Sequence, residues 1–494
     1  MKRKHLVRLT AGIAFFLAFM VPGQVGYSES KERKDSGSES RNVIMGYSGN
    51  TIETGARAAT ISGGGRYGFP NRVTNDMGSV SGGAGNEAGS LATVSGGGGN
   101  VASGIRSTIG GGEENRATRD SSVIGGGYGN IAEGAHATVG GGIANTAGEV
   151  DATVGGGSGN AASERHTTVS GGSVNKSSGF ASSIGGGTYN RARATYSAVG
   201  GGISNTASGM EATVSGGAGN FASGEAAGIG GGMSNRASGS YSAIAGGRAN
   251  AAGREENDPK GGAYASVGGG LENVASGSFS TVPGGSQNLA AGDHSFAAGH
   301  RAKVDASHEG VFLFADHQRN DFASAAPNEF AVRSSGGVRF VTGTDIGGRP
   351  TAGVRISAGG GAWETLSDKL SKTAFSAVNS QEILERLEML PIQIWSYRTE
   401  DPQVRHIGPT GQDFHEIFQV GKDGRFINTV DADGVALAAV QGLLLSVREK
   451  EAMIADQREQ IRKMEAEMSA QRMRTAELEE RLSQIERIVE KGSH

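Results

Sequence analysis

Ser367 and Lys372 form a pair whose residue types and spacing suggest covalent chemistry. A serine hydroxyl is a poor nucleophile until a base takes its proton, and a neutral lysine amine can act as that base. Burial or nearby positive charge favours the neutral amine, whereas the adjacent Asp368 favours the charged form unless its carboxylate points elsewhere. In that case Asp368 is a candidate supporting residue that holds the serine or the cleaved amide. Serine and lysine at this spacing also occur together by chance, so a polar neck without chemistry is the alternative interpretation.

Acidic residues at two other places raise the question of cation binding. Glu255, Glu256 and Asp258 lie in one polar segment, which we interpret as a solvated loop. Asp431 and Asp433 precede an apolar run, and helix capping explains Asp433 more simply than a metal does. The chain has no Cys, which excludes disulfides and thiolate metal sites. We therefore predict no metal site and no cofactor.

Glycine accounts for 86 of the 494 residues, and the apolar fraction is 36%. So much glycine without the strict triplet of collagen indicates either repeated tight turns or disorder. A phosphate-binding loop needs one glycine-rich turn between a strand and a helix, but these glycines recur with no helical segment after them. The net charge of −4 is too close to balance for a nucleic-acid-binding protein.

A repeat of 15 residues decides between turns and disorder, because a linker would not hold one position to Val or Ile over eleven successive units. Each unit also carries one asparagine, and the polar segment 254–260 interrupts the series before it resumes at Val267. The repeated positions are Asn100, Asn115, Asn130, Asn145, Asn160, Asn175, Asn190, Asn205, Asn220, Asn235 and Asn250, with Val94, Ile109, Ile124, Val139, Val154, Val169, Ile184, Val199, Val214, Ile229 and Ile244.

Each unit predicts one coil of a β-solenoid with two short strands. The β-branched residue points inward, and the Gly-Gly and Ser-Gly pairs supply corners with positive φ. Asn tolerates the left-handed conformation and can cap a turn through its side chain. Coils stack at about 4.8 Å. One Val or Ile with a few Ala is too little to fill a coil, so we expect three chains to bury this row along a shared axis.

The N-terminal segment has the features of an export signal. Residues 1–28 combine a basic start with the short apolar stretch 9–21, and small residues near position 28 suit cleavage. An uncleaved signal anchor is the alternative. Residues 29–42 read as a polar linker, followed by the repeats at 43–304. We therefore expect a secreted or cell-surface protein without an integral membrane anchor.

The region after the repeats changes character. Short β-type runs at 305–342 predict a small β cap, and the Gly-rich segment 343–366 predicts a neck. Asn379 is expected to cap a helix that Pro391 stops. Strand-like runs follow at 392–397 and 426–430, and a long helix is expected to start with Asp433 as its N-cap.

A heptad pattern over 440–489 predicts a C-terminal coiled coil, because apolar residues alternate at spacings of three and four with charged residues on the flanks. A single amphipathic surface helix is the alternative. The first row contains Val440, Val447, Ile454, Ile461, Met468, Thr475, Leu482 and Val489, and the second Leu443, Lys450, Gln457, Met464, Gln471, Leu478 and Ile485.

The repeats resemble those of known fibrous surface proteins. The Ala/Ser-Gly coils, closing with HSFAAGHRAKV (294–304), look like the head repeats of YadA-like trimeric adhesins. They are still more similar to repeats of bacterial tail-fibre-domain proteins, in which a segment like 310–343 follows. This resemblance implies a left-handed parallel β-roll assembled as a homotrimer.

The block 367–445 resembles the peptidase S74 domain, the intramolecular chaperone at the C-terminus of endosialidases and other phage tail spikes. The resemblance rests on the Ser-Asp-x-x-x-Lys spacing, on HIGPTGQDF (406–414) and on TVDADGVALAAVQGL (429–443), in this order. It implies that Ser367 and Lys372 cut the chain's own Leu366–Ser367 bond once, after the domain has templated trimer assembly. The residues between the pair, and TAFSAV after it, depart from the usual family pattern, and a chaperone-like fold without cleavage is the alternative.

His406, Gln412 and Asp413 match a family motif, and we expect them to pin a turn by hydrogen bonds. The fold class is therefore mainly β: a trimeric solenoid shaft, a β cap, an α+β chaperone domain and a coiled coil. The expected function is an exported fibre that binds a cell surface or glycan. The alternatives are a non-cleaving trimerisation domain on such a fibre and a polysaccharide-acting spike, for which no acidic pair stands at a defined place.

Overall fold

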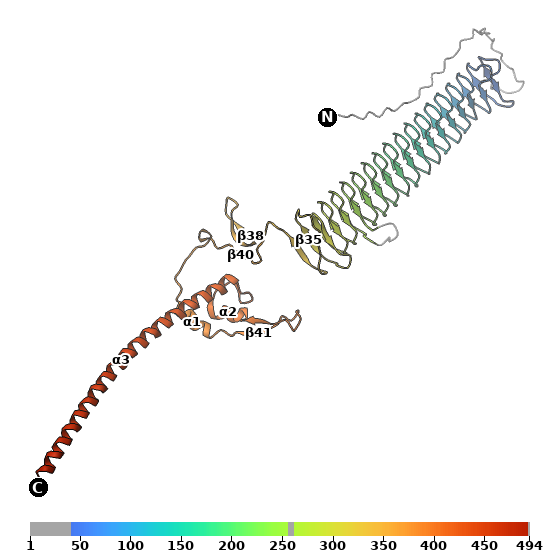
Figure 1. Cartoon of the computed structure of the whole chain (residues 1–494). Helices are drawn as coiled ribbons and strands as arrows, with labels where there is room; N and C mark the ends of the chain where they lie inside the picture. The colour runs from blue at the N-terminus through green and yellow to red at the C-terminus, as the bar shows by residue number, and fades with distance from the viewer. Residues whose placement is uncertain (1–40, 255–260, 493–494) are drawn as a thin grey trace, which may run out of the picture. The chain divides into compact units, whose positions relative to one another are not determined.

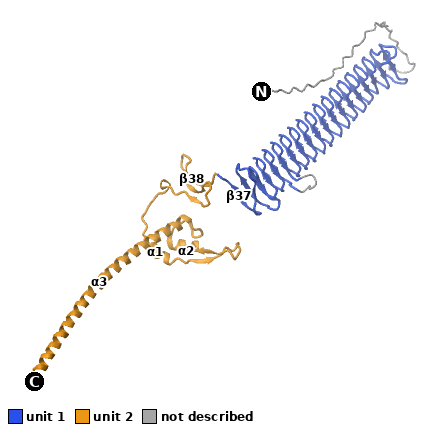
Figure 2. Ribbon diagram, viewed as in Figure 1, with its two compact units in different colours: residues 1–335 blue, residues 336–494 orange. Residues whose placement is uncertain are grey.

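The computed structural model describes residues 41–254 and 261–492. The chain divides into two compact units, residues 1–335 and 336–494 (Figure 2), and each is considered by itself. The predicted signal peptide 1–28, the linker up to residue 40 and the acidic residues Glu255, Glu256 and Asp258 lie outside the described residues.

The first unit is a parallel β-solenoid, which confirms the fold predicted from the 15-residue repeat (Figure 1). Its odd-numbered strands form a 19-stranded sheet, called sheet A here. Sheet A contains β1 (Val43–Ile44), β3 (Thr60–Ile61), β5 (Ser79–Val80), β7 (Thr93–Val94), β9 (Thr108–Ile109), β11 (Val123–Ile124), β13 (Thr138–Val139), β15 (Thr153–Val154), β17 (Thr168–Val169), β19 (Ser183–Ile184), β21 (Ala198–Val199), β23 (Thr213–Val214), β25 (Gly228–Ile229), β27 (Ala243–Ile244), β29 (Ser266–Val267), β31 (Thr281–Val282), β33 (Phe296–Gly299), β35 (Phe312–Ala315) and β37 (Phe330–Arg333).

The even-numbered strands form a second parallel sheet, called sheet B, on the other side of each coil. A third ladder of single-residue bridges, such as Gly98 to Glu113, runs beside them. Sheet B contains β2 (Thr51–Ile52), β4 (Arg72–Val73), β6 (Glu87–Ala88), β8 (Val101–Ala102), β10 (Arg116–Ala117), β12 (Ile131–Ala132), β14 (Thr146–Ala147), β16 (Ala161–Ala162), β18 (Lys176–Ser177), β20 (Arg191–Ala192), β22 (Thr206–Ala207), β24 (Phe221–Ala222), β26 (Arg236–Ala237), β28 (Ala251–Ala252), β30 (Val274–Ala275), β32 (Leu289–Ala290), β34 (Ala302–Val304) and β36 (Phe322–Ala323).

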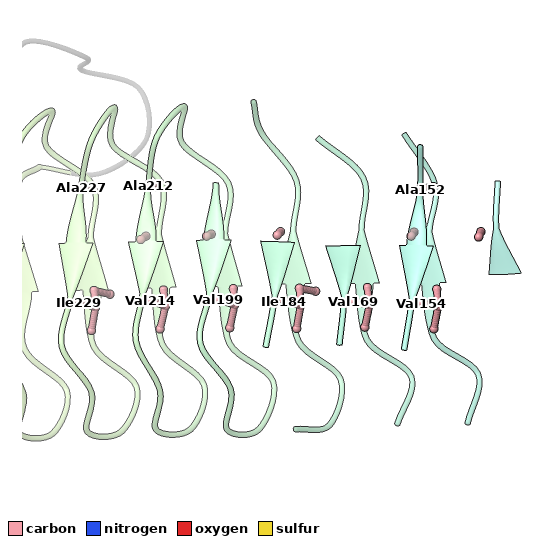
Figure 3. Packing of buried hydrophobic residues seen from close by; sticks show 14 of the residues in the cluster. Ala152, Val154, Val169, Ile184, Val199, Ala212, Val214, Ala227 and Ile229 are labelled. Atoms are coloured by element: carbon pink, nitrogen blue, oxygen red, sulfur yellow. The ribbon is translucent and has the colours of Figure 1, made fainter. Parts of the chain in front are cut away.

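The core of the solenoid is closed within one chain. The second residue of each two-residue sheet A strand from β3 to β31 is a Val or Ile that is at most 2% exposed. Figure 3 shows these side chains in line from coil to coil, with Ala152, Ala212 and Ala227 beside them. The buried Ala of sheet B faces the same interior. The expectation that three chains are needed to bury the Val and Ile row was therefore wrong, because the small residues at neighbouring positions bring the two sheets close enough to exclude water.

The repeated asparagines form a hydrogen-bond ladder along the buried edge of the coils. The Nδ2 atom of Asn160 donates to the carbonyl oxygens of Gly156 and Gly172, each at 2.8 Å. Its Oδ1 atom accepts from the backbone N–H of Asn175 at 3.0 Å. The same pattern links successive asparagines from Asn50 to Asn288. The predicted side-chain capping is thus confirmed, but the predicted left-handed backbone is wrong for these repeated asparagines.

Asn160→Ala is expected to lower the free energy of unfolding by about 2 to 4 kcal/mol, since it removes the side-chain hydrogen bonds to the Gly156 and Gly172 carbonyls and leaves the buried Asn175 N–H without its partner. Because each coil of a solenoid contacts only the coils next to it, the loss of stability is expected to be local. Hydrogen exchange should show faster exchange of the Asn175 amide and of the adjoining coils. Ser158→Ala, at an exposed position of the same coil, is the control. Unchanged protection at Asn175 would contradict the ladder's contribution.

Glycine acts differently at the two corners. Gly172 has φ +91° as predicted for the Gly-Gly corner, and an added Cβ would lie 2.1 Å from the Gly187 carbonyl oxygen. Gly104, from the Ser-Gly pair, has no positive φ, but a Cβ there would lie 2.0 Å from the Arg119 carbonyl oxygen. The positive φ of this second corner falls instead on Arg106, at +59°. The second glycine is therefore required by the close stacking of coils.

The predicted β cap at 305–342 differs from the structure, because β35 and β37 continue sheet A in parallel register with β33. Arg333 closes this end of the solenoid. Its Nε atom lies 3.0 Å from Asp316 Oδ1, its Nη1 atom donates to the Asn320 carbonyl at 2.7 Å, and its guanidinium lies over the Phe322 ring. The last coil is thus held by polar contacts where no further coil covers it.

This end of the solenoid is expected to loosen in acid. Hydrogen bonds from Ser335, and then from Arg333, hold the pKa of Asp316 well below its usual range. A depressed pKa in the folded state contributes stability above the unfolded pKa of about 3.9, and this stability is lost as the pH falls. Amides of 312–333 should exchange faster at pH 3 than at pH 6 relative to those of the central coils. Asp316→Asn should remove the difference, and its persistence in that variant would contradict this assignment.

The second unit begins with a three-stranded antiparallel sheet rather than the predicted Gly-rich neck at 343–366. Its strands are β38 (Val338–Thr344), β39 (Pro350–Ile356) and β40 (Glu364–Thr365). Asp345 closes the β38–β39 hairpin by accepting from the backbone N–H groups of Gly347 and Arg349. The glycines that suggested a linker therefore lie in a turn and in a strand.

The remainder of the second unit is α+β. It contains the 3₁₀ turn η1 (Lys369–Ser371), α1 (Ser380–Glu388), β41 (Gln393–Trp395), β42 (His406–Gly408), α2 (Gly411–Phe418) and α3 (Thr429–Lys491). Its small core consists of Leu390, Phe414, Phe418 and Val435. Helix α1 lies against α3 at Gly442, where an added Cβ would be 2.2 Å from the Ser380 carbonyl oxygen. This glycine permits the two helix backbones to approach.

The helix predictions are confirmed in part. Asn379 caps α1 as predicted, by accepting from two backbone N–H groups. The predicted cap Asp433 was wrong, because Asn428 caps α3 and Asp433 lies inside the helix. The predicted strand at 426–430 was also wrong, since α3 already begins at Thr429. Helix α2, whose N-cap is Thr410, was not predicted.

Helix α3 is also the one described helix that is long and apolar enough in part to cross a membrane. One such helix is weak evidence. Asp431 and Asp433 lie near its start, and α1 packs against this part of it. These features favour a helix that associates with protein.

Candidate functional site

The Ser367–Lys372 pair is brought together by a short turn. Ser367 follows β40 after one residue, and η1 then folds the chain back, with the Lys372 N–H donating to the Lys369 carbonyl at 3.2 Å. As a result, the Lys372 Nζ atom lies 2.6 Å from Ser367 Oγ and donates a hydrogen bond to it. A nucleophile and an amine base in proton-transfer contact is the arrangement that serine–lysine chemistry requires.

Asp368 serves the turn itself. Its side chain accepts a hydrogen bond from the backbone N–H of Leu370 at 3.0 Å, which makes it the N-cap of η1. Since the carboxylate is engaged with the backbone, it holds the turn that carries Lys372 toward Ser367. The structure thus places Asp368 as a positioning residue in this turn.

Both members of the pair are exposed to solvent in the single chain. A lysine acts as a base only when it is neutral, and removal from water favours the neutral amine. The single chain therefore supplies the contact between the two side chains but not the dry surroundings that would activate the amine.

The residue before Ser367 is fixed on the preceding sheet. The backbone N–H of Leu366 donates to the Gly353 carbonyl at 3.0 Å. A surface hollow of about 340 Å³ lies over β38–β40 and includes Leu366 and Ser367 in its lining. The bond between these two residues therefore lies at the border of a defined surface.

The motif residues around His406 have structural partners. His406 Nε2 lies 2.8 Å from Glu400 Oε2, and the His406 ring packs 4.9 Å from that of Trp395 across the β41–β42 pair. Asp413 accepts from the Thr410 hydroxyl at 2.6 Å and donates its backbone N–H to the same oxygen. Gln412 lies in the first turn of α2. These contacts pin the hairpin and the start of α2, as expected of a structural role.

The acidic pair Asp431 and Asp433 lies in the first turns of α3. Among residues 41–254 and 261–492, no group of three or more His, Cys, Asp or Glu side chains is arranged to hold a metal ion. Asp431 is the acidic residue of the first turn, where the partial positive charge of the helix end favours it.

Sequence reasoning missed the residues of the sheet next to the pair. Gly353, Arg355 and Glu364 lie in a segment that glycine content had suggested was a linker. The β-branched and aromatic residues of VRFVT (338–342), and Val354 and Ile356 on either side of Arg355, are the signal that favours strands there.

Comparison with known protein families gives one match. Residues 367–420 match the family Peptidase_S74, described as "Chaperone of endosialidase". The match begins at Ser367 and includes η1, α1, the β41–β42 pair and α2. No curated protein matches the chain.

Proposed function

We propose that this chain is an exported homotrimeric fibre whose C-terminal domain drives assembly of the trimer and then cuts the Leu366–Ser367 bond. A solenoid fibre fold and an endosialidase-type chaperone domain together fit a tail-fibre-like protein. The observation that carries the proposal is the 2.6 Å contact between Lys372 Nζ and Ser367 Oγ at the first residue of the matched domain.

Assembly is supported by apolar surface in the second unit. Helix α3 extends well beyond the small core, and the apolar members of its first heptad row are 43–64% exposed. Val440, Ile454 and Ile461 are examples. A helix with a mostly apolar heptad seam is stabilised when other helices cover that seam. Three copies of α3 in a parallel coiled coil would supply this cover.

The shaft offers a second surface for association between copies. The outward-facing residues of sheet A, from Val43 in β1 to Phe330 in β37, include no charged residue. The outward residues of sheet B include Arg72, Arg116 and Lys176. Near the end of sheet A the rings of Phe296, Phe312 and Phe330 stack with centroids 4.6 and 4.9 Å apart. Absence of charge together with exposed aromatic rings is typical of the centre of a protein interface.

A lysine on sheet A should weaken this association. Thr153→Lys, in the middle of the uncharged face, is expected to bury a charge in each copy and to lower the association constant of the shafts by about tenfold or more. Ala161→Lys, on the next strand in sheet B, is the matched control. Sedimentation of both variants over a concentration series measures the effect. Equal behaviour of the two variants would contradict association through sheet A.

The cleavage chemistry follows from the pair. Neutral Lys372 takes the Ser367 hydroxyl proton as Oγ attacks the carbonyl carbon of Leu366. The proton then passes to the Ser367 nitrogen as the peptide C–N bond breaks, which leaves Leu366 joined to Oγ as an ester. Water hydrolyses the ester to a Leu366 carboxylate and regenerates the hydroxyl of a new N-terminal Ser367. The reaction occurs once per chain.

Exposure of the pair in the single chain links cleavage to assembly in this proposal. A neighbouring copy that covers η1 would exclude water from Lys372 and favour its neutral form. Export is supported by the basic and apolar segments of residues 1–28. A surface or glycan ligand of the shaft stays a prediction.

The full exported chain tests the proposal directly. Mass spectrometry of the purified protein should find one fragment that ends at Leu366 and another that begins at Ser367. Analytical ultracentrifugation should give three copies per particle. An intact chain would contradict self-cleavage, and a monodisperse monomer would contradict assembly.

A further inference from the structure

We propose that the sheet β38–β40 is the substrate-holding element of the self-cleavage reaction, and that Gly353 and the Arg355–Glu364 pair position the Leu366 carbonyl for attack by Ser367. This inference rests on the proposed self-cleavage. It assigns a role to a segment, 338–366, that lies before the residues matching the chaperone family.

The segment before Ser367 is bound as an edge strand. β40 pairs with β39 in antiparallel register, with Glu364 opposite Arg355 and Thr365 opposite Val354. The hydrogen bond from the Leu366 N–H to the Gly353 carbonyl extends this pairing by one residue, to the residue whose carbonyl is attacked. Binding of an extended peptide to a sheet edge is a general mode of peptide recognition, because the backbone bonds fix the peptide and leave its side chains free for selection.

The acceptor Gly353 has to be glycine. Its φ is +149°, and an added Cβ would lie 2.2 Å from the Phe340 carbonyl oxygen. Val341 of β38 is the register partner of Gly353, and the register between β38 and β39 shifts directly after Val341. This irregularity brings the two backbones close at the position from which the Gly353 carbonyl reaches Leu366.

A charge pair anchors the other end of the bound segment. Arg355 Nε lies 2.6 Å from Glu364 Oε2, and the Ser357 hydroxyl donates to Glu364 Oε1 at 2.8 Å. Both carboxylate oxygens are thus engaged, and these bonds lower the pKa of Glu364, with Arg355 the larger cause. The segment is therefore held two residues before Leu366 as well as at Leu366 itself.

Fixing this strand should accelerate the reaction through orientation. A free peptide samples many backbone conformations, and small errors in the position of a reacting carbonyl slow reactions by large factors. Ser367 and Lys372 lie in a turn that starts directly after the bound strand, so the strand sets where the Leu366 carbonyl stands relative to Oγ. After the cut, residues 338–366 stay with the shaft fragment, because they precede the cleaved bond.

Two measurements on full-length protein test the inference. In an uncleavable Ser367→Ala chain, the Leu366 amide should be protected from hydrogen exchange, and Glu364→Ala should increase its exchange rate. In the active chain, pulse-labelled and followed on denaturing gels, Glu364→Ala should slow cleavage by about tenfold or more at an unchanged oligomeric state. The exchanged pair Arg355→Glu with Glu364→Arg should restore both the protection of the Leu366 amide and the rate of cleavage. Arg349→Ala, in the turn of the same hairpin, is the control.

The outcomes separate this inference from the proposed function. If the wild-type chain is cut and Glu364→Ala is cut equally fast, the positioning role is overturned while self-cleavage stands. Rapid exchange of the Leu366 amide in the Ser367→Ala chain would also overturn it. If the wild-type chain is never cut, self-cleavage itself fails, and the role of the sheet in it fails with it.

Discussion

Ser367→Ala is expected to yield a chain that stays whole, with cleavage at Leu366–Ser367 at least about a thousandfold slower than in the wild type. The substitution removes the hydroxyl oxygen to which Lys372 Nζ donates a hydrogen bond, and it removes little else, since Ser367 is exposed. A denaturing gel of wild type and variant, expressed in parallel, measures the result. The variant should still assemble, because its apolar surfaces are unchanged.

Lys372→Arg distinguishes the base from a simple hydrogen-bond donor. Arginine keeps the positive charge and the ability to donate to Ser367 Oγ, but it cannot lose a proton in a protein. We therefore expect Lys372→Arg to be as inactive as Ser367→Ala. Ser371→Ala, which removes a hydroxyl from the same turn, should be cut at the wild-type rate. Fragments from Ser367→Ala, or an active Lys372→Arg chain, would refute the assigned chemistry.

The sequence predicts the solenoid well because its determinants are local and repeated. Val154, Val169 and Ile184 recur at one interval, and a parallel ladder requires each coil to repeat the conformation of the last. The number of chains needed to close the core is not local information. It depends on the distance between sheet A and sheet B, and small buried residues such as Ala162 set this distance. The residue type alone does not tell that such an Ala is buried.

The second unit was predictable only in part. Asn379 carries a capping signal that acts within three residues, and the structure uses it. For α3, Asp433 was the predicted cap, but the structure uses Asn428, five residues earlier. The strand predicted at 426–430 was wrong because Val430 lies in the first turn of α3, whose Val435 joins the core cluster of Phe414 and Phe418.

The candidate site, too, could be predicted from the sequence only in part. The spacing of Ser367 and Lys372 is visible in the sequence, and so is the neighbouring Asp368. Whether Asp368 opposes or supports the pair depends on the direction of its carboxylate, which only the η1 turn settles. The partners of Leu366 lie 13 residues earlier in the chain, at Gly353, so sequence proximity does not identify them.

Replacing two residues of the α3 seam is expected to abolish assembly. Ile454→Asp with Ile461→Asp places two carboxylates per chain in the predicted interface, where burial of an unpaired charge costs several kcal/mol, so we expect about a hundredfold or greater loss of association. Ultracentrifugation in the Ser367→Ala background should shift the particle from three chains to one. In the active chain the same change should also suppress cleavage, because no second copy then covers the Ser367–Lys372 turn.

The control for this pair adds the same charge to the same helix away from the seam. Ala455 and Ala466 lie outside both heptad rows, on the charged side of α3, so Ala455→Asp with Ala466→Asp keeps the net charge equal to that of the seam variant. This control chain should assemble and be cut like the wild type. If the seam variant stays trimeric, α3 does not hold the copies together. If it is monomeric yet cut at the wild-type rate, cleavage does not depend on assembly, and the single chain must activate Lys372 by itself.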